Sequence, residues 1–113
     1  MTQNPNLVRG TLDLLILKSL TWEQRHGYGI NEWIELVTDG SLLMEEGTLY
    51  PALHRLRGKG LVESEWGLSE NNRRAKYYRL TRDGKKYLDA EAASWTRYTS
   101  AVAKALAMEA PVS

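Results

Sequence analysis

The chain contains no cysteine and no phenylalanine, and only three of its 113 residues are proline. Without cysteine it can form neither disulfides nor zinc–thiolate sites. Its longest uninterrupted aliphatic run, Leu14 to Leu17, is far too short for a membrane span or a signal-peptide core. We therefore expect a cytoplasmic protein with no membrane partner. Its length predicts one domain, which dimerisation would help to bury apolar surface.

The basic residues are concentrated in the middle of the chain. Gly47 to Lys86 holds ten of the fifteen Lys and Arg residues but four of the fourteen Asp and Glu residues, a net charge of +6. The remaining residues sum to −5, so the overall charge of +1 hides this polarity. A basic block in a nearly neutral protein is the pattern expected of a surface that binds a polyanion.

Two helices are predicted before the basic segment. Met1 to Asn6 is polar and contains a proline, so we expect an arm there, followed by a helix from the N-cap Thr11 to about Leu20. That helix is apolar on two sides, which is typical of a helix packed between its own domain and a partner. After a polar connection at residues 23–27, apolar side chains at helical spacing predict a second helix ending near Gly40: Ile30, Trp33, Ile34 and Val37.

The third predicted helix runs from about Glu46 to Lys59 and is closed by Gly60. Its buried stripe consists of Leu49, Ala52, Leu53 and Leu56. The opposite face carries groups that can contact phosphates or base edges: Thr48, Tyr50, Pro51, His54, Arg55 and Gly58. Arg55 is long enough to contact a guanine through two N–H groups. Glu45 and Glu46 either weigh against DNA at this helix end or complement the helix dipole.

Two strands and a long helix complete the chain. Leu61 to Trp66 and Ala75 to Leu80 are predicted strands, joined by the turn-rich segment Gly67 to Arg74. Basic side chains lie at or beside the tip of this hairpin: Arg73, Arg74 and Lys76. Thr81 then caps a helix extending to about Glu109, with a seam at spacings of four and three: Leu88, Ala92, Trp95, Thr99, Val102 and Leu106.

The order of these elements predicts a mainly α fold with a small β-hairpin, a winged helix-turn-helix followed by a long C-terminal dimerisation helix. In such a fold the second helix braces the third, which enters the major groove of duplex DNA, while the hairpin contacts the backbone or minor groove. We expect residues 1–80 to form the DNA-binding domain, with its N-terminal arm, and residues 81–113 to form the dimerisation helix.

Catalytic interpretations find little support. His26 and His54 do not have a metal-ligand spacing, so no metal or cofactor is expected. Gly27-Tyr28-Gly29 has part of a phosphate-loop pattern, but Glu32 occupies its last glycine position, and close helix packing explains the glycines better. We expect no enzyme. The alternatives to DNA binding are a winged helix used only for protein interaction or dimerisation, and a small-molecule carrier.

Three stretches resemble the PadR-like family of bacterial transcriptional regulators. They are HGYGI (residues 26–30), GTLYPALHRLRGKGLV (residues 47–62) and RRAKYYRLTRDGKK (residues 73–86). The resemblance implies a homodimeric repressor of an inverted-repeat operator, released by an effector. It also implies that the C-terminal helix packs on the partner's first helix, as in the short subfamily with a single such helix.

Trp95 has two interpretations. It either packs in a dimer core or lines an interface cavity that stacks a small planar aromatic effector. The family resemblance favours the second, because short members place a ligand-stacking tryptophan there. The residues that we predict to surround the effector are Leu88, Ala92, Trp95 and Thr99.

Overall fold

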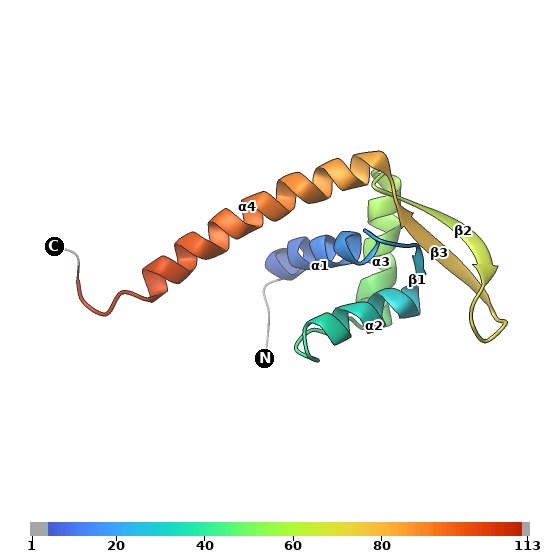
Figure 1. Cartoon of the computed structure of the whole chain (residues 1–113), viewed down its shortest axis with the longest axis horizontal. Helices are drawn as coiled ribbons and strands as arrows, with labels where there is room; N and C mark the ends of the chain where they lie inside the picture. The colour runs from blue at the N-terminus through green and yellow to red at the C-terminus, as the bar shows by residue number, and fades with distance from the viewer. Residues whose placement is uncertain (1–4, 112–113) are drawn as a thin grey trace.

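A computed structural model describes the backbone of residues 5–111 and the side chains of residues 10–111. Its elements are α1 (Pro5–Ser19), β1 (Arg25–His26), α2 (Gly27–Val37), α3 (Glu46–Gly58), β2 (Val62–Leu68), β3 (Arg74–Leu80) and α4 (Arg82–Leu106). Figure 1 shows α1, α2 and α3 gathered at the centre, the β2–β3 hairpin projecting on one side and α4 on the other. This arrangement confirms the predicted winged helix-turn-helix with a long C-terminal helix.

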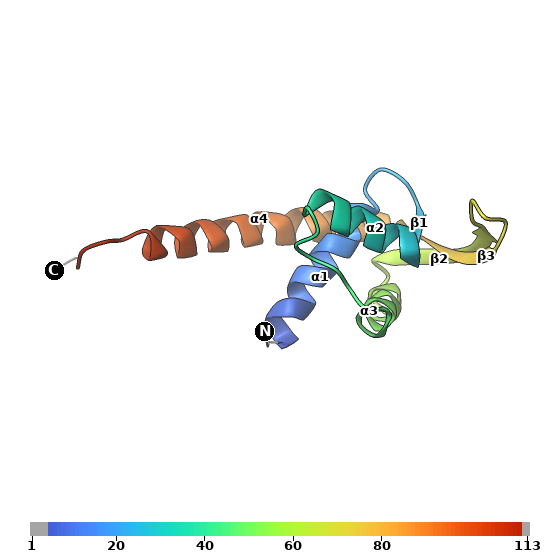
Figure 2. The same ribbon diagram turned by 90° about the horizontal axis from the view of Figure 1, so that it is seen from below.

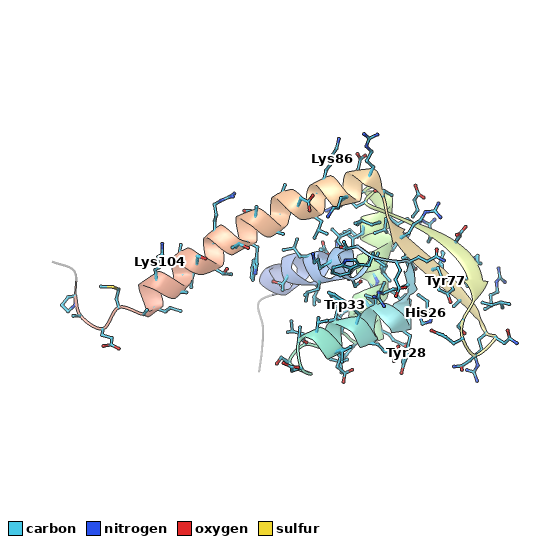
Figure 3. All side chains as sticks on the ribbon, in the orientation of Figure 1. His26, Tyr28, Trp33, Tyr77, Lys86 and Lys104 are labelled. Atoms are coloured by element: carbon cyan, nitrogen blue, oxygen red, sulfur yellow. The ribbon has the colours of Figure 1, made fainter. Side chains whose placement is uncertain are left out.

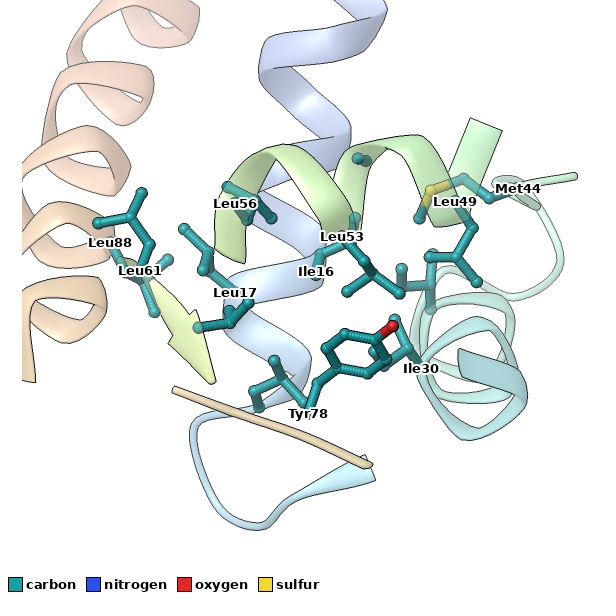
Figure 4. Packing of buried hydrophobic residues seen from close by; sticks show 14 residues of the cluster. Ile16, Leu17, Ile30, Met44, Leu49, Leu53, Leu56, Leu61, Tyr78 and Leu88 are labelled. Atoms are coloured by element: carbon teal, nitrogen blue, oxygen red, sulfur yellow. The ribbon is translucent and has the colours of Figure 1, made fainter. Parts of the chain in front are cut away.

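One hydrophobic core holds the three short helices, the base of the hairpin and the first turns of α4 together (Figure 4). The predicted stripe of α3 is buried, as are Ile30 and Ile34 of α2. In α1, Leu17 is as completely buried as Ile16, because α1 packs against α2, α3 and α4 at once. The apolar character of α1 on two sides is therefore largely satisfied within one chain.

The beginning of α1 differs from the prediction. The helix starts at Pro5 and continues through Gly10 and Thr11, so Thr11 is not its N-cap. Proline is compatible with the first helical position, where no intrahelical hydrogen bond is lost. The predicted arm is therefore wrong for Pro5 and Asn6, and its other residues, 1–4, lie outside the described part of the chain.

The sheet has three strands in the order β1-β3-β2, all antiparallel. The predicted polar connection at residues 23–27 contains the short strand β1, in which Arg25 pairs with Tyr78 and His26 pairs with Tyr77. Two residues are too few to show a strand periodicity, which is why the pattern did not reveal β1. This strand ties the start of α2 to the hairpin.

The ends of the helices are fixed by specific contacts. Gly40 and Gly60 have φ values of 77° and 74°, the left-handed conformation expected of a glycine after a helix. Between α2 and α3, the Asn31 side chain donates to the carbonyl of Met44 and accepts from its N–H. Thr81 is the N-cap of α4, as predicted, and its hydroxyl accepts from the N–H of Gly84 at 2.9 Å.

Only the beginning of α4 belongs to the core. Gly84 and Leu88 are its buried residues, and from Asp89 to Leu106 every residue except Thr99 is exposed. Figure 2 shows α4 extending away from the other elements. The radius of gyration is consequently 16.4 Å, compared with about 13 Å for a compact domain of this length.

Candidate nucleic-acid interface

The outer face of α3 is open to solvent. Thr48, Tyr50, Pro51 and His54 are exposed there, and Figure 2 shows α3 nearly end-on at one side of the molecule. Pro51 lies inside the helix and lacks the N–H that would bond to the Gly47 carbonyl, but both residues are exposed, so water can satisfy that oxygen. The face therefore presents hydroxyl, imidazole and carbonyl groups to a partner.

Arg55 does not belong to this outer face, contrary to the prediction. Its Nη2 atom lies 2.5 Å from Oδ1 of Asp13 on α1, and only 28% of its side chain is exposed. Asp13 itself is 7% exposed. Arg55 lies at the edge of the buried stripe of α3, where the packing of α1 decides its direction. The ion pair links α3 to α1 and occupies one nitrogen of the Arg55 guanidinium.

Arg57 is a basic residue of α3 that the sequence interpretation did not select. It is exposed, and its Nη1 atom donates to the hydroxyl of Ser64 on β2 at 3.3 Å. Arg57 follows Tyr50 by seven residues, a spacing that puts both on the flank of α3 facing the hairpin. The seven-residue spacing from Tyr50 could have identified Arg57 from the sequence, because the hairpin follows α3 directly.

Close packing brings Tyr50 against the start of α2. A Cβ atom on Gly27 would lie 2.7 Å from the Tyr50 hydroxyl oxygen, so only glycine permits this approach. The prediction that the glycines serve helix packing is confirmed for Gly27. Behind Tyr50, burial raises the pKa of the Tyr78 phenol, with a smaller contribution from Tyr50 itself. The Tyr78 hydroxyl therefore loses its proton less readily than an ordinary tyrosine does.

The two faces of the hairpin have opposite electrostatic characters. Side chains alternate along each strand, so Trp66, Arg74 and Lys76 share the face that carries the buried Tyr78 next to α3. The reverse face carries Arg79, whose Nη2 lies 2.7 Å from Glu63 and whose Nη1 lies 3.4 Å from Glu65. The hydrogen bond with Glu63 and the negative charge of Glu63 raise the pKa of Arg79, and the charge of Glu65 makes a smaller contribution in the same direction. We call the face formed by Trp66, Arg74 and Lys76 the inner wing face.

The cations of the inner wing face have no acidic partner in the part of the chain whose side chains the structure describes. Within residues 10–111, no ion pair includes Arg73, Arg74 or Lys76. Arg74 and Lys76 instead lie near the ring of Trp66, with Cζ at 4.3 Å and Nζ at 5.5 Å from its centroid. Their positive charge is therefore free to interact with an anion.

The loop of the hairpin is attached to the start of α2. His26 caps α2 by accepting the N–H of Gly29 on Nδ1 at 3.0 Å, which leaves the proton on Nε2, 3.4 Å from the Glu70 carboxylate. A hydrogen bond with the backbone of Glu70 itself makes the largest contribution to lowering the pKa of the Glu70 carboxyl. The hydrogen bond with His26 lowers that pKa further. The His26 ring also contacts Tyr77, with centroids 5.3 Å apart, and Figure 3 shows the two side by side. His26 thus has a structural role at the junction of α2 and the hairpin.

An open groove of about 830 Å³ lies between α2, α3 and the hairpin. Its walls include Tyr28, Tyr50 and Trp66 together with the three basic residues Arg73, Arg74 and Lys76. Thr48, Pro51 and His54 do not line this groove. The structure therefore brings most of the predicted DNA-binding residues to two adjoining surfaces, and it adds Arg57 and Trp66 to them.

The predicted effector residues lie on α4, away from this groove. Trp95 is 38% exposed and lies 6.3 Å from the Tyr98 ring, centroid to centroid, while Ala92 is exposed and Thr99 is partly buried. Leu88 is 3% exposed and packs in the core of its own chain, so it is a poor candidate to line a ligand cavity. The Thr99 hydroxyl donates to the Trp95 carbonyl at 2.9 Å.

The part of the chain that the structure describes has neither a metal-binding cluster nor a membrane-spanning helix. No group of three or more His, Cys, Asp or Glu side chains there could hold a metal ion. No helix there has the combination of length and apolar character that crossing a membrane requires.

Residues 16–90 match the model of the family described as "Transcriptional regulator PadR-like family". An uncharacterised protein of Lysinibacillus sphaericus is 36% identical over 90 residues, which cover 80% of this chain and 83% of that protein. Among solved structures, a transcriptional regulator from Clostridium thermocellum is 33% identical with a TM-score of 0.78, covering 88% of this chain and 96% of that chain. A PadR family transcriptional regulator from Eggerthella lenta is 35% identical with a TM-score of 0.74, covering 92% and 88% of the two chains.

Proposed function

Since this chain belongs to the transcriptional regulator PadR-like family, we propose that it binds duplex DNA as a homodimeric, sequence-specific repressor. The observation that carries the proposal is the adjacency of two surfaces: the exposed outer face of α3 and the inner wing face, whose cations have no acidic partners within the described residues. An α-helix fits the major groove, while cations on a projecting hairpin reach the flanking backbone.

We propose different DNA contacts for α3 and for the hairpin, according to their positions in the fold. Thr48, Tyr50, Pro51 and His54 contact base edges or nearby phosphates, and Arg57 extends this surface toward the hairpin. Arg73, Arg74 and Lys76 contact the backbone or the minor groove. Arg55 supports this surface from behind through Asp13.

The exposed part of α4 supports the proposal of a dimer. Its apolar side chains are exposed in the single chain, including Trp95, Tyr98, Val102 and Leu106. We assign residues 1–80 to DNA binding and residues 81–113 to dimerisation. A two-fold axis would set two α3 helices on an inverted repeat, with half-sites one helical turn, roughly 34 Å, or a multiple of it apart.

Salt-dependent binding to a promoter fragment tests the DNA-binding proposal. Fluorescence anisotropy would measure the affinity for DNA from upstream of the protein's own gene over a range of salt concentrations. The double variant Arg74→Ala/Lys76→Ala should bind less tightly, and the slope of log affinity against log salt should fall by about 1 for each lost phosphate contact. Arg97→Ala/Lys104→Ala, which removes two exposed cations of α4, is the matched control and should bind like the wild type.

The outcome also separates DNA binding from the alternative function. A winged helix used only for protein interaction would show no salt-dependent DNA affinity, and the two double variants would then behave alike. Such a result would overturn the proposal. The small-molecule carrier would bind its ligand without any effect on DNA.

A small planar aromatic effector is part of the proposed function. Trp95 and Tyr98 present adjacent aromatic rings on α4, with the small exposed side chain of Ala92 beside them. Two such surfaces facing each other across a dimer axis could stack a flat ligand. A planar dye should quench tryptophan fluorescence and weaken DNA binding. Trp95→Ala should abolish both effects, while Trp22→Ala, which removes a tryptophan that is 65% exposed elsewhere, should leave the weakening of DNA binding unchanged.

A further inference from the structure

Trp66 is a large aromatic residue that lies mostly outside the core. Its side chain is 57% exposed on β2, although tryptophan is mostly buried in folded proteins. The core ends before Trp66 is reached, because Val62 is the buried residue of β2. Packing in the hydrophobic core therefore does not account for an indole at this position.

The surroundings of Trp66 are cationic. Lys76 is its direct cross-strand partner, and Arg74 lies two residues away on the same face of β3. Both cations approach the indole, with Arg74 Cζ at 4.3 Å and Lys76 Nζ at 5.5 Å from the ring centroid. These distances fall within the range in which a ring face attracts a cation.

The reverse face of the same hairpin offers an internal comparison. There Arg79 is fixed by Glu63 and Glu65, which neutralise its charge and occupy its N–H groups. An indole restricts a guanidinium differently, because the ring contacts its flat face and leaves its charge and its N–H groups available. One hairpin thus contains an arginine fixed by carboxylates and an arginine fixed by a ring.

We propose that Trp66 is a positioning residue that holds Arg74 and Lys76 on the inner wing face, ready for DNA. The proposal rests on the proposed DNA-binding function and identifies a residue that strengthens the contact of the hairpin with DNA phosphates. Long flexible cations lose side-chain entropy when they bind a phosphate, and a ring that restricts them beforehand reduces that loss. Trp66 lines the groove beside Tyr50, so the two cations are held on the side of α3.

The contact between ring and cation is tested first without DNA. The Nε–H resonance of Arg74, assigned by its loss in Arg74→Ala, should show an upfield ring-current shift that disappears in Trp66→Leu. Trp22→Leu, which removes a tryptophan outside the hairpin, should leave that shift unchanged. An Arg74 resonance at the same position in the wild type and in Trp66→Leu would overturn the proposal.

DNA binding is then tested with a double-mutant cycle. Trp66→Leu should weaken binding about threefold to tenfold, mainly through faster dissociation, whereas Trp66→Tyr, which keeps a ring, should recover most of the loss. In the Arg74→Ala/Lys76→Ala background, Trp66→Leu should cost nothing further, because the groups that it positions are gone. Melting temperatures of all variants would show that the hairpin remains folded.

Each outcome distinguishes between the two proposals. If the wild type binds DNA and Trp66→Leu binds equally well, the role of Trp66 is overturned and the DNA-binding function stands. If Trp66→Leu costs the same with and without the two cations, Trp66 contacts DNA directly or supports the fold, and the positioning role is likewise overturned. A wild type without salt-dependent affinity overturns the DNA-binding function, even if the free protein shows the ring-current shift.

Discussion

Asp13 and Arg55 form the most consequential polar contact inside the protein. Asp13 is buried within α1, Arg55 comes from α3, and the Nε atom of Arg55 is buried without a hydrogen-bond partner among the described residues. When a partly buried ion pair loses one of its members, the remaining charge has neither a partner nor full access to water. The folded state is destabilised as a result. This contact fixes how α3 is held against α1.

Asp13→Ala should therefore destabilise the protein markedly. We expect the free energy of unfolding to fall by about 2–4 kcal/mol, slightly below the range for fully buried pairs because 28% of the Arg55 side chain is exposed. Urea denaturation followed by circular dichroism would measure it. Arg57→Ala, an exposed change on the same helix, should cost no more than about 0.5 kcal/mol. Equal losses in the two variants would show that water solvates Arg55 adequately.

Gly27→Ala should damage the DNA-binding surface more than the fold. The new methyl group would meet the hydroxyl end of Tyr50, a side chain of a residue that is 46% exposed and can move aside, so the stability should change by less than about 1 kcal/mol. The displacement of Tyr50 should lower DNA affinity at least about threefold. Gly29→Ala is the control, because its Cβ would make only an ordinary contact of 3.5 Å with His26. Anisotropy titrations in which both variants bind alike would argue against a role for Tyr50.

Single residues could be predicted where periodicity alone decides their environment. The buried stripe of α3 is of this kind, and Thr81 could be predicted because threonine is a preferred residue at a helix N-cap. Arg55 could not be predicted, because it lies on a flank of α3 and only the packing of α1 brings Asp13 to it. The role of Trp66 depends on the register of β2 and β3, which the sequence leaves open until the loop length is known.

The joint between the hairpin and α4 shows how tightly two elements can be fixed. Gly84 is buried in the first turn of α4, and a Cβ atom there would collide with the carbonyl oxygen of Leu61 and lie 2.9 Å from Cδ1 of Leu80. The hydroxyl of Thr81 also donates to the carbonyl of Gly60 at 2.7 Å. The direction in which α4 leaves the domain is therefore set by backbone contacts.

Gly84→Ala should destabilise the protein although alanine favours helices. A methyl group cannot be accommodated against backbone, so we expect a loss of about 2–3 kcal/mol in thermal or urea unfolding. Gly58→Ala is the matched control, since Gly58 is also helical but has open space around it, and it should gain up to about 1 kcal/mol. A Gly84→Ala protein as stable as the wild type would mean that α4 can shift at its base.

The extent to which elements could be predicted followed their length. The helices α2 and α3 have enough turns for a clear apolar stripe, and turn-forming residues delimit the two long strands. The two-residue strand β1 gives no pattern, and the start of α1 is misleading because Thr11 is a good N-cap that the helix simply continues through. For β1 and for the start of α1, contacts with the rest of the fold determine the structure, because local sequence preference does not.

The dimensions of the molecule, 63 × 30 × 23 Å, are those of a small domain with one long helix attached. The fold class could be predicted because the order of elements is distinctive. The contacts that the exposed length of α4 makes in an assembly could not be derived from one chain, because its apolar side chains are exposed in that chain. Its seam is therefore the surface on which assembly is tested.

Val102→Glu should dissociate the proposed dimer. Val102 lies on the seam, and a carboxylate buried there by association would raise the dissociation constant at least about a hundredfold, as measured by sedimentation velocity over a range of concentrations. Ala101→Glu adds the same charge about 100° around α4 from Val102, outside the seam, and should leave the dimer intact. A wild type that sediments as a monomer at every concentration would contradict the proposed assembly.

The fixed base of α4 gives this helix the properties of a lever. About eighteen residues beyond Leu88, at 1.5 Å each, make an arm of roughly 27 Å, so a rotation of 10° at the base moves the tip by about 5 Å. The relation also runs in reverse. A shift of one or two ångströms near Trp95, about seven residues from Leu88, corresponds to a tilt of the helix axis by roughly 5–10° about its base. By this geometry, a small change in side-chain packing along the arm is equivalent to an angle of several degrees between α4 and the rest of the domain.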